Sequence, residues 1–350
     1  MLTIAFFGPV NSGKSTLVNT IAGQEVSLVS AVPGTTTDPV RKRIELPGLG
    51  PCLLIDTAGL DDSSILGAER ERRTRAVLDE ADVAVLLGPV AQVEKSGVPI
   101  VRYERGESVE SLIGRIAALA PIQEEKFLTS SLVKAGDTVL LVMPQDSEAP
   151  KGRLILPQVQ VIRELLDRGC VPVCCTPSSL APAVRSVSPA LVITDSQVFK
   201  LVNETIPREW PLTSFSVLLA GAKGDMKTFL EGARAIDSLK PGDHVLIAEA
   251  CTHVPDTEDI GRVKIPALLK AKLLQPAENA EVLRVTVSAG NDFPEDLSPY
   301  SLIIHCGACV ATSTLVRSRI RRALAAGVPI TNYGLALAAL QGILSRISIP

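Results

Sequence analysis

Cysteine and histidine residues gather in two short stretches of the C-terminal third of the sequence. In each stretch, an apolar run that is typical of a buried strand ends in a turn that carries thiol and imidazole groups. Such groups bind zinc and iron-sulfur clusters. The candidate metal ligands are Cys251, His253, His305, Cys306 and Cys309.

The spacing of these residues leaves the identity of the metal open. Their pattern is C-x-H followed, at long separation, by H-C-x-x-C. Zinc accepts three thiolates and one imidazole as a closed tetrahedral site. A [4Fe-4S] cluster takes the same three thiolates and leaves one iron for a weak or exchangeable ligand. Unrelated buried thiols are a third interpretation, because free cysteine is among the most buried residue types.

The N-terminal segment carries a second pattern with its own chemistry. A strand predicted for Leu2 to Phe7 is followed by G-P-V-N-S-G-K-S and by a helix predicted for Thr16 to Ala22, which matches the phosphate-binding loop G-x-x-x-x-G-K-[ST]. Backbone N–H groups of such a loop surround phosphate oxygens, its lysine contacts the outer phosphates, and its serine binds Mg²⁺. The predicted nucleotide-binding residues here are Gly8, Asn11, Ser12, Gly13, Lys14, Ser15 and Thr16, with Ser15 also as a Mg²⁺ ligand.

Two polar motifs follow the phosphate loop in the order expected of the two switches of a GTPase. A threonine-rich loop covers Pro33 to Asp38, and an apolar strand ends at Asp56 shortly before Gly59. A loop threonine senses Mg²⁺ and the terminal phosphate, a strand-end aspartate holds the metal through water, and a glycine lets its N–H approach the γ-phosphate. Thr36, Thr37 and Asp56 join the predicted nucleotide site, and the predicted catalytic residues are Lys14, Thr37, Asp56 and Gly59.

The first switch motif resembles that of the translation-factor-like GTPases, a group that includes tRNA-modifying and ribosome-assembly GTPases. The motif is Gly-Thr-Thr-Thr-Asp at residues 34–38. The resemblance implies that Asn11 helps to bind an activating K⁺. Leu60 stands where a Ras-like enzyme has a water-orienting glutamine, which implies slow intrinsic hydrolysis.

The guanine-reading motif of a GTPase is missing from this sequence. That motif is Asn-Lys-x-Asp at a strand end, and no asparagine here is followed by lysine. The chain also passes almost directly from a predicted strand, Ala81 to Leu87, to the next, Val98 to Val101, and to the helix Val109 to Leu119, so about one β-α unit is absent. GTP is therefore an expectation from resemblance, and hydrolysis is expected to be impaired. The sequence Lys-Gly-Asp at 223–225 copies half of the motif and is predicted to be a turn.

Strands and helices alternate along the rest of the chain, which predicts parallel sheets. We predict an α/β protein of three consecutive α/β domains with mostly parallel sheets, the first a P-loop GTPase-like domain. Their predicted limits are 1–122, 123–213 and 214–350. A strand is predicted for Thr213 to Leu218. Both cysteine-histidine stretches follow strands of the last domain, and open sheets bind ligands at the carboxyl ends of their strands.

Length and composition limit the classes of protein that this sequence can represent. The 350 residues suffice for two or three domains, and 35 basic against 38 acidic residues give a net charge of −3 without a basic run suited to nucleic acid. No apolar stretch reaches the roughly 18 residues that a membrane helix needs, and no secretory leader is visible at the N-terminus. Seven scattered cysteines favour a reducing cytoplasm over a disulfide framework.

The complete arrangement resembles the HydF family, the scaffold GTPases of [FeFe]-hydrogenase maturation. A switch-type GTPase domain, a middle α/β domain and C-terminal Cys-Thr-His followed by His-Cys-x-x-Cys carry the likeness, which covers nearly the whole chain. Further matching segments are residues 34–39, 149–154, 192–197, 257–266 and 331–334.

The resemblance to this family implies a ligand set, a cargo and partners. It implies that Cys251, Cys306 and Cys309 bind a [4Fe-4S] cluster, and that His253 and His305 either bind the remaining iron or lie around it. The open position would hold a di-iron precursor, built by two radical-SAM maturases, until delivery to apo-[FeFe]-hydrogenase. GTP with Mg²⁺ and K⁺ would modulate partner release, and the middle domain would form a homodimer.

Three other functions compete with this interpretation. A tRNA-modification-type GTPase shares the switches, but that family ends in a cysteine-containing motif and this chain ends in Ser-Arg-Ile-Ser-Ile-Pro. An iron-sulfur lyase would need a general base that the motifs do not supply. A zinc-stabilised regulatory G protein fits the ligand types equally well.

Overall fold

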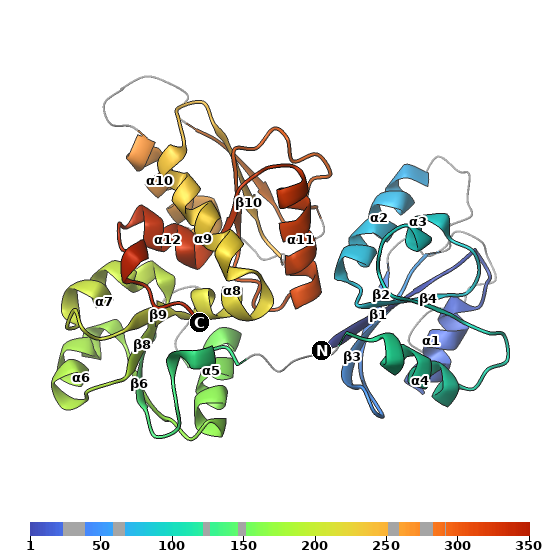
Figure 1. Cartoon of the computed structure of the whole chain (residues 1–350), viewed down its shortest axis with the longest axis horizontal. Coiled ribbons are helices and arrows are strands. Elements are labelled where there is room, and N and C mark those ends of the chain that lie inside the picture. Colours follow the sequence, from blue (N-terminus) through green and yellow to red (C-terminus); the bar gives the residue numbers. More distant parts are fainter. Residues whose placement is uncertain are drawn as a thin grey trace. The chain divides into compact units, whose positions relative to one another are not determined.

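The computed structural model describes residues 1–23, 39–58, 67–121, 127–145, 152–250, 259–273, 283–290 and 292–350. These residues form two compact units, Met1–Glu124 and Glu125–Pro350 (Figure 1). The predicted fold class is confirmed, because the described strands form three sheets that are parallel except for one strand pair. None of the helices in these ranges combines the length and apolar character needed to cross a membrane.

The first unit is a single sheet between two layers of helices. Its described strands run in the order β2-β3-β1-β4-β5, and only β2 is antiparallel to its neighbour. The strands are β1 (Leu2–Phe7), β2 (Val40–Leu46), β3 (Gly50–Asp56), β4 (Val83–Leu86) and β5 (Ile100–Arg102). The helices are α1 (Lys14–Ala22), α2 (Gly67–Glu80), α3 (Ala91–Glu94) and α4 (Val109–Leu119).

Alternating side chains of β1 supply two cores, one on each face of the sheet. Ile4 and Phe6 belong to the core that includes Leu17 of α1, whereas Phe7 packs in the other core with Val77 of α2. A strand that is apolar on both faces is typical of a parallel sheet covered on both sides. This burial fixes the carboxyl end of β1, where the phosphate loop begins.

The second unit contains two parallel sheets that share one core. Its first sheet has the order β7-β6-β8-β9 and its second the order β11-β10-β12-β13 within the described residues. Leu140 and Val192 of the first sheet belong to the same hydrophobic cluster as Leu246 and Ile303 of the second. The two sheets are therefore parts of one packed body.

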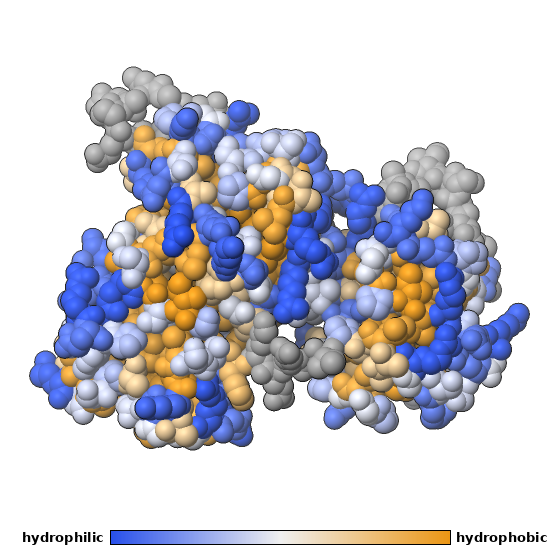
Figure 2. Space-filling view, in the orientation of Figure 1, coloured by the Kyte–Doolittle hydropathy of each residue, from blue (hydrophilic) through white to orange (hydrophobic). Residues whose placement is uncertain are grey.

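The elements of the second unit follow one another along the chain as alternating strands and helices. The first sheet and its helices are a short 3₁₀ helix (Ser130–Leu132), β6 (Thr138–Val142), α5 (Leu156–Asp167), β7 (Val171–Cys175), a short 3₁₀ helix (Pro177–Ser179), α6 (Leu180–Ser186), β8 (Leu191–Thr194), a short 3₁₀ helix (Ser196–Val198), α7 (Phe199–Thr205) and β9 (Leu212–Ser214). The remainder is α8 (Phe215–Lys223), α9 (Met226–Ala235), a short 3₁₀ helix (Ile236–Ser238), β10 (His244–Ala248), a π-helical turn (Ile260–Lys264), α10 (Ile265–Leu273), β11 (Arg284–Ser288), β12 (Leu302–His305), α11 (Ser313–Ala325), β13 (Ile330–Asn332), α12 (Tyr333–Leu340) and a short 3₁₀ helix (Leu344–Arg346). In Figure 2, hydrophilic side chains cover α7, and apolar ones reach the surface around α12.

The prediction of a strand over Thr213 to Leu218 was wrong for most of these residues. The strand β9 ends at Ser214, whose hydroxyl accepts a hydrogen bond from the N–H of Val217 at 3.2 Å and so caps the start of α8. Most residues of α8 are buried, because the helix contacts α5, α11 and α12. An apolar run buried on all sides has no helical period that would distinguish it from a strand.

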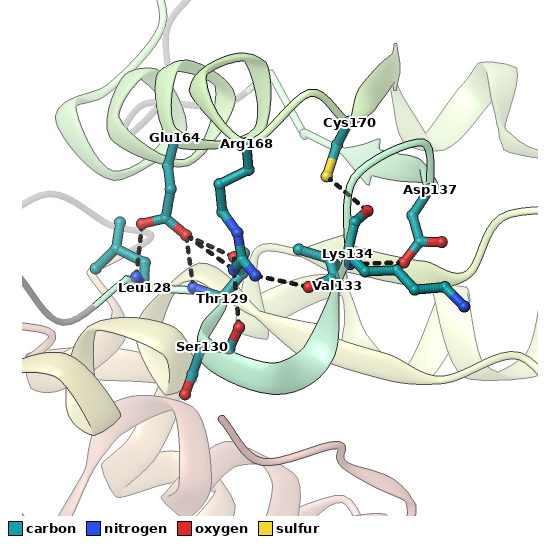
Figure 3. A network of polar contacts seen from close by, with 9 residues as sticks. All are labelled: Leu128, Thr129, Ser130, Val133, Lys134, Asp137, Glu164, Arg168 and Cys170. Atoms are coloured by element: carbon teal, nitrogen blue, oxygen red, sulfur yellow. Dashed lines mark hydrogen bonds and ion pairs between the residues drawn. The ribbon is translucent and has the colours of Figure 1, made fainter.

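A partly buried network of hydrogen bonds attaches the start of the second unit to α5 (Figure 3). The carboxylate of Glu164 accepts hydrogen bonds from the N–H groups of Leu128, at 2.6 Å, and Thr129, at 2.8 Å. Arg168 donates to the carbonyl oxygens of Ser130, at 2.8 Å, and Val133, at 2.7 Å. These contacts tie the segment that enters the unit to the C-terminal half of α5.

We expect Glu164→Ala to lower the free energy of unfolding of the second unit by about 2–3 kcal/mol, because hydrogen bonds to charged groups contribute about 1.5–3 kcal/mol each. Chemical denaturation followed by circular dichroism measures the loss. Glu204→Ala on α7 is the control, since Glu204 is exposed. Equal unfolding midpoints for the two variants would contradict the role given to the network.

Candidate functional site

The predicted phosphate loop joins the buried end of β1 to the first turn of α1. Asn11 has φ 59° and Gly13 has φ 91°, so the chain turns through two left-handed residues before the helix begins at Lys14. An α-helix leaves the N–H groups of its first turn without intrahelical partners and carries partial positive charge at that end. The loop therefore presents N–H groups of the kind that bind phosphate.

Gly8 keeps the loop close to the neighbouring strand. A Cβ atom at Gly8 would lie 2.8 Å from the Oγ of Ser12 and 3.1 Å from the carbonyl oxygen of Leu87. A side chain at Gly8 would require the Ser12 hydroxyl to rotate away and the carbonyl group of Leu87 to shift by a few tenths of an ångström. The sequence prediction that a glycine is needed here has this steric cause.

The ammonium group of Lys14 lies at the mouth of the loop. Its Nζ donates to the carbonyl oxygens of Gly8, at 3.0 Å, and Pro9, at 2.7 Å, and contacts the Oγ of Ser12 at 3.4 Å. Lys14 is only 6% exposed. The structure thus holds a positive charge against the loop backbone, where the outer phosphates of a nucleotide would lie.

Asp56 ends β3 beside the loop, because Asp56 is in register with Phe6 of β1. It is 5% exposed, and its Oδ1 has no hydrogen-bond partner among the described residues. Thr57 is held next to it by a 2.6 Å hydrogen bond from its hydroxyl to the carbonyl oxygen of Phe6. Burial of a carboxylate oxygen that accepts no hydrogen bond costs free energy. Asp56 is therefore suited to accept hydrogen bonds from the water ligands of a Mg²⁺ ion. Ser15 and Thr16 lie in the first turn of α1, because the helix begins at Lys14, two residues before its predicted start at Thr16.

Two ion pairs lie beside the edge strand β5 of the described sheet. Arg102, the last residue of β5, pairs with Glu94 at 2.7 Å, and Arg115 of α4 pairs with Glu107 at 3.0 Å. Arg115 also donates to the carbonyl oxygen of Arg102 at 2.8 Å. The carboxylates of Glu94 and Glu107 are therefore engaged by arginines.

Three predicted residues of the nucleotide site, Thr36, Thr37 and Gly59, lie outside the described residues. The same is true of two predicted metal ligands, Cys251 and His253. Among the residues that the structure does describe, no group of three or more His, Cys, Asp or Glu side chains forms a metal site.

The sulfur of Cys306 receives two backbone hydrogen bonds. Cys306 follows β12 directly, and its Sγ accepts from the N–H of Ala250 at 3.1 Å and from the N–H of Ala308 at 3.4 Å. Ala250 lies just past the end of β10 and immediately precedes Cys251 in the sequence. The chain that leads into Cys251 is therefore bonded to the sulfur of Cys306. N–H groups that donate to sulfur stabilise thiolate ligands, so Cys306 fits a cluster site.

The loop that continues to Cys309 turns through Ala308, which has φ 52°. Lys223, at the end of α8, donates from Nζ to the carbonyl oxygens of Ala308, Cys309 and Ala311 at 2.6, 3.1 and 3.0 Å. Burial lowers the pKa of Lys223, and the nearby Cys309 and Cys306 oppose that shift. Lys223 was predicted to lie in a turn, and the fold brings it to the loop that contains Cys306 and Cys309.

Both ring nitrogens of His305 are engaged inside the protein. His305 is 1% exposed, its Nδ1 lies 2.8 Å from the carbonyl oxygen of Cys306, and its Nε2 lies 3.1 Å from Nη1 of Arg319. Arginine only donates, so Nε2 accepts and Nδ1 carries the proton. Burial lowers the pKa of His305 to about 3, helped by the charge of Arg319 and opposed by the hydrogen bond to Cys306. The ring is therefore neutral near pH 7.

Arg319 of α11 connects His305 to the end of β10. The guanidinium is 1% exposed, donates to the carbonyl oxygen of Glu249 at 3.2 Å and lies over the ring of Phe293 at 4.9 Å. The carboxylate of Glu249 in turn binds Arg262 through contacts of 3.1 and 2.7 Å. Arg319 was not among the predicted site residues, because an arginine in a charged helix is typical of an exposed face.

The sequence matches three protein-family models in succession. Residues 3–113 match a 50S ribosome-binding GTPase, residues 128–224 match the hydrogen maturase F dimerization domain, and residues 227–350 match the hydrogen maturase F tetramerization domain. The two maturase models cover nearly all of the second unit.

Curated relatives match only the GTPase part. The tRNA modification GTPase MnmE of Methylobacterium sp. (strain 4-46) is 46% identical over 88 residues, which are 25% of this chain and 20% of that protein. MnmE of Myxococcus xanthus (strain DK1622) is 47% identical over 94 residues, which are 26% of this chain and 21% of that protein. The chain thus spans about a fifth of the length of these relatives.

Solved structures resemble the chain only distantly. Era from Aquifex aeolicus bound to GDP.AlF4- is 16% identical, with 84% of this chain and 96% of that chain covered and a TM-score of 0.26. A bacterial selenocysteine-specific elongation factor EF-Sec is also 16% identical, with 53% and 29% covered and a TM-score of 0.21.

A GTPase domain followed by two maturase domains is the arrangement that the sequence motifs indicated. The chain belongs to the hydrogen maturase F (HydF) family, as a member whose shortened GTPase domain lacks the Asn-Lys-x-Asp motif.

Proposed function

We propose that this protein is a scaffold and carrier in [FeFe]-hydrogenase maturation. Its C-terminal domain, residues 214–350, holds a [4Fe-4S] cluster through Cys251, Cys306 and Cys309. When bound, such a cluster supplies an iron that is open to an additional ligand. The cargo is a di-iron precursor that two radical-SAM maturases build and that passes to apo-[FeFe]-hydrogenase. Reduced thiols suit a cytoplasmic location.

The main support for this proposal is a backbone hydrogen bond that joins the two cysteine-histidine stretches. The residue before Cys251, Ala250, donates its N–H to the sulfur of Cys306, although the two cysteines are far apart in the sequence. Both stretches follow neighbouring parallel strands, since β10 pairs with β12. The third thiol, on Cys309, lies in the loop that Lys223 holds. His305 already binds Arg319 and Cys306, which favours a role beside the cluster rather than on the iron.

We propose that the first domain, residues 1–122, binds a nucleotide. This binding regulates the release of the maturases and the apo-hydrogenase. Lys14 and the helix N-terminus bind the phosphates, Ser15 and Asp56 act on Mg²⁺, and Asn11 contributes to a K⁺ site. Thr36, Thr37 and Gly59 sense the γ-phosphate, whose loss changes the order of a switch loop. Without an Asn-Lys-x-Asp motif, most of the affinity for GTP comes from the phosphates.

The middle domain, residues 123–213, forms a homodimer through the open edge of its sheet. The edge strand β7 has an exposed Val171, at 54%, and an exposed Cys174. The opposite edge strand, β9, is buried, and Leu212 forms a bridge to Ile347. An apolar, uncovered edge strand is a surface on which a second copy can add its own strand.

We expect Val171→Lys to halve the mass of the oligomer, because it places a charge on the proposed contact of each copy. Light scattering after size-exclusion chromatography measures the mass. Leu119→Lys on α4 is the control, since Leu119 is 47% exposed in the GTPase domain. An unchanged oligomer mass in the Val171 variant would refute β7 as the interface.

Anaerobic reconstitution with iron and sulfide tests the scaffold function. The native chain should bind about four iron and four sulfide and show the absorption and EPR spectra of a [4Fe-4S] cluster. Cys306→Ser should lose most of this signal because it removes one of three thiolates. Cys174→Ser is the matched control and should keep it. A colourless, EPR-silent native protein that holds one zinc ion would overturn the proposal.

A further inference from the structure

Lys223 makes an unusually complete set of contacts with the cysteine loop, residues 306–312. An ammonium group has three N–H donors and no acceptor. Nζ of Lys223 lies 2.6, 3.1 and 3.0 Å from the carbonyl oxygens of Ala308, Cys309 and Ala311. All three donors can therefore be used within one loop, which requires the charged form of the side chain.

These contacts hold a loop whose own backbone bonds are sparse. Ala308 has a left-handed φ of 52°, an uncommon conformation for a residue other than glycine. Among the described residues, the backbone hydrogen bond that closes a turn within residues 306–312 joins the N–H of Ala311 to the carbonyl oxygen of Ala308, at 3.2 Å. Three carbonyl dipoles that converge on one point repel each other unless a cation lies between them. Lys223 supplies that cation and so fixes the path of the chain through Cys309.

The helix that carries Lys223 is fixed to other parts of the second unit. Ser214 caps its start and receives a hydrogen bond from Ser196 at 2.8 Å. In its first turn, the Oγ of Ser216 accepts from Asn332 at 3.1 Å and from the N–H of Gly334 at 3.2 Å. The position of Lys223 is therefore set by contacts from both sheets, independently of the cysteine loop.

The charge of Lys223 also lies beside the sulfur-bearing residues. A [4Fe-4S] cluster with three thiolate ligands carries a net negative charge that increases on reduction, and nearby charges and hydrogen bonds tune its reduction potential. A fixed cation next to Cys309 would favour the reduced state. No titration of Lys223 is needed for this effect, because its three carbonyl contacts require the protonated group.

The geometry points to Lys223 as a positioning residue that shapes the cysteine loop and raises the reduction potential of the cluster bound there. The effect of Lys223 on the cysteine loop concerns the folded chain without a cluster. Its effect on the reduction potential rests on the proposed cluster site.

The first experiment uses the 350-residue chain without iron. Hydrogen exchange at residues 306–312 is compared in the native protein, Lys223→Met, Lys223→Arg and the control Lys227→Met, whose lysine is exposed on α9. Loss of a charged hydrogen-bond network should speed exchange in Lys223→Met by about tenfold or more. Lys223→Arg should recover most of the protection, and Lys227→Met should match the native protein. Native exchange rates in Lys223→Met would overturn the positioning role.

The second experiment uses the same proteins after anaerobic reconstitution and an EPR-monitored redox titration. Lys223→Met should have a more negative potential than the native protein and Lys227→Met. Equal potentials would overturn the role of the charge. If Lys223→Met does not fold, Lys223→Gln, which keeps an N–H donor without the charge, takes its place in both experiments. A native chain that binds no cluster would refute the proposed function while leaving the exchange result to decide the role of Lys223.

Discussion

Lys14→Ala should reduce nucleotide hydrolysis by at least about 10²–10³-fold, the usual loss when one preorganised group that stabilises transition-state charge is removed. In the structure the Lys14 ammonium is 6% exposed and contacts the carbonyl oxygens of Gly8 and Pro9, so its charge is fixed at the loop before any nucleotide arrives. Alanine removes this charge and leaves the backbone of the loop in place. Phosphate release under steady-state conditions, with Mg²⁺ and K⁺ present, measures the effect.

The matched control for this variant is Lys95→Ala, because Lys95 is an exposed lysine of the same unit. It should hydrolyse GTP at the native rate. The [4Fe-4S] spectrum of Lys14→Ala should equal that of the native chain, since Lys14 and the cysteine loop belong to different compact units. Hydrolysis within a few fold of native would contradict the role of Lys14, and loss of the cluster signal would contradict separable sites.

The second large effect concerns pH and the cluster-free chain. The pKa of His305 falls from 6.5 to about 3 in the folded protein, mainly through burial. Between these values the unfolded chain binds a proton that the folded chain does not, so stability rises with pH. The contribution is fully present above pH 6.5 and is lost as pH falls toward 3. Its slope is about 1.4 kcal/mol per pH unit, with an upper limit of roughly 5 kcal/mol.

Comparison of the native chain with His305→Asn isolates this contribution from that of the carboxylates. Denaturant unfolding between pH 7 and 4.5 should show the difference between the two free energies of unfolding shrinking by about 1.4 kcal/mol for each pH unit below 6.5. His244→Asn is the control on the same sheet. His244 is only half-buried and contacts Thr286 at 2.8 Å, so its pH dependence should be smaller. A difference between native and His305→Asn that does not change with pH would show that the ring is not held neutral.

Features that depend only on neighbours along the chain could be predicted from the amino-acid sequence. The phosphate loop needs only a strand, two left-handed residues and a helix start, and Asn11, Gly13 and Lys14 occupy those positions within one short segment. The alternation of strands and helices likewise predicted the parallel sheets, and an apolar run predicted that Cys306 follows a strand end. Local backbone geometry and hydrophobic period are sufficient for such features.

The groups that surround the candidate cluster site come from distant parts of the chain and could not be predicted from the sequence. His305 was a candidate iron ligand by residue type, but its partner Arg319 comes from the following helix and occupies Nε2. Lys223 reaches the loop of Cys309 from α8, whose residues Phe215 to Leu218 were predicted as a strand because a helix buried on all sides lacks an amphipathic period. Hydrogen bonds between residues far apart in sequence depend on how whole elements pack, and no local pattern encodes them.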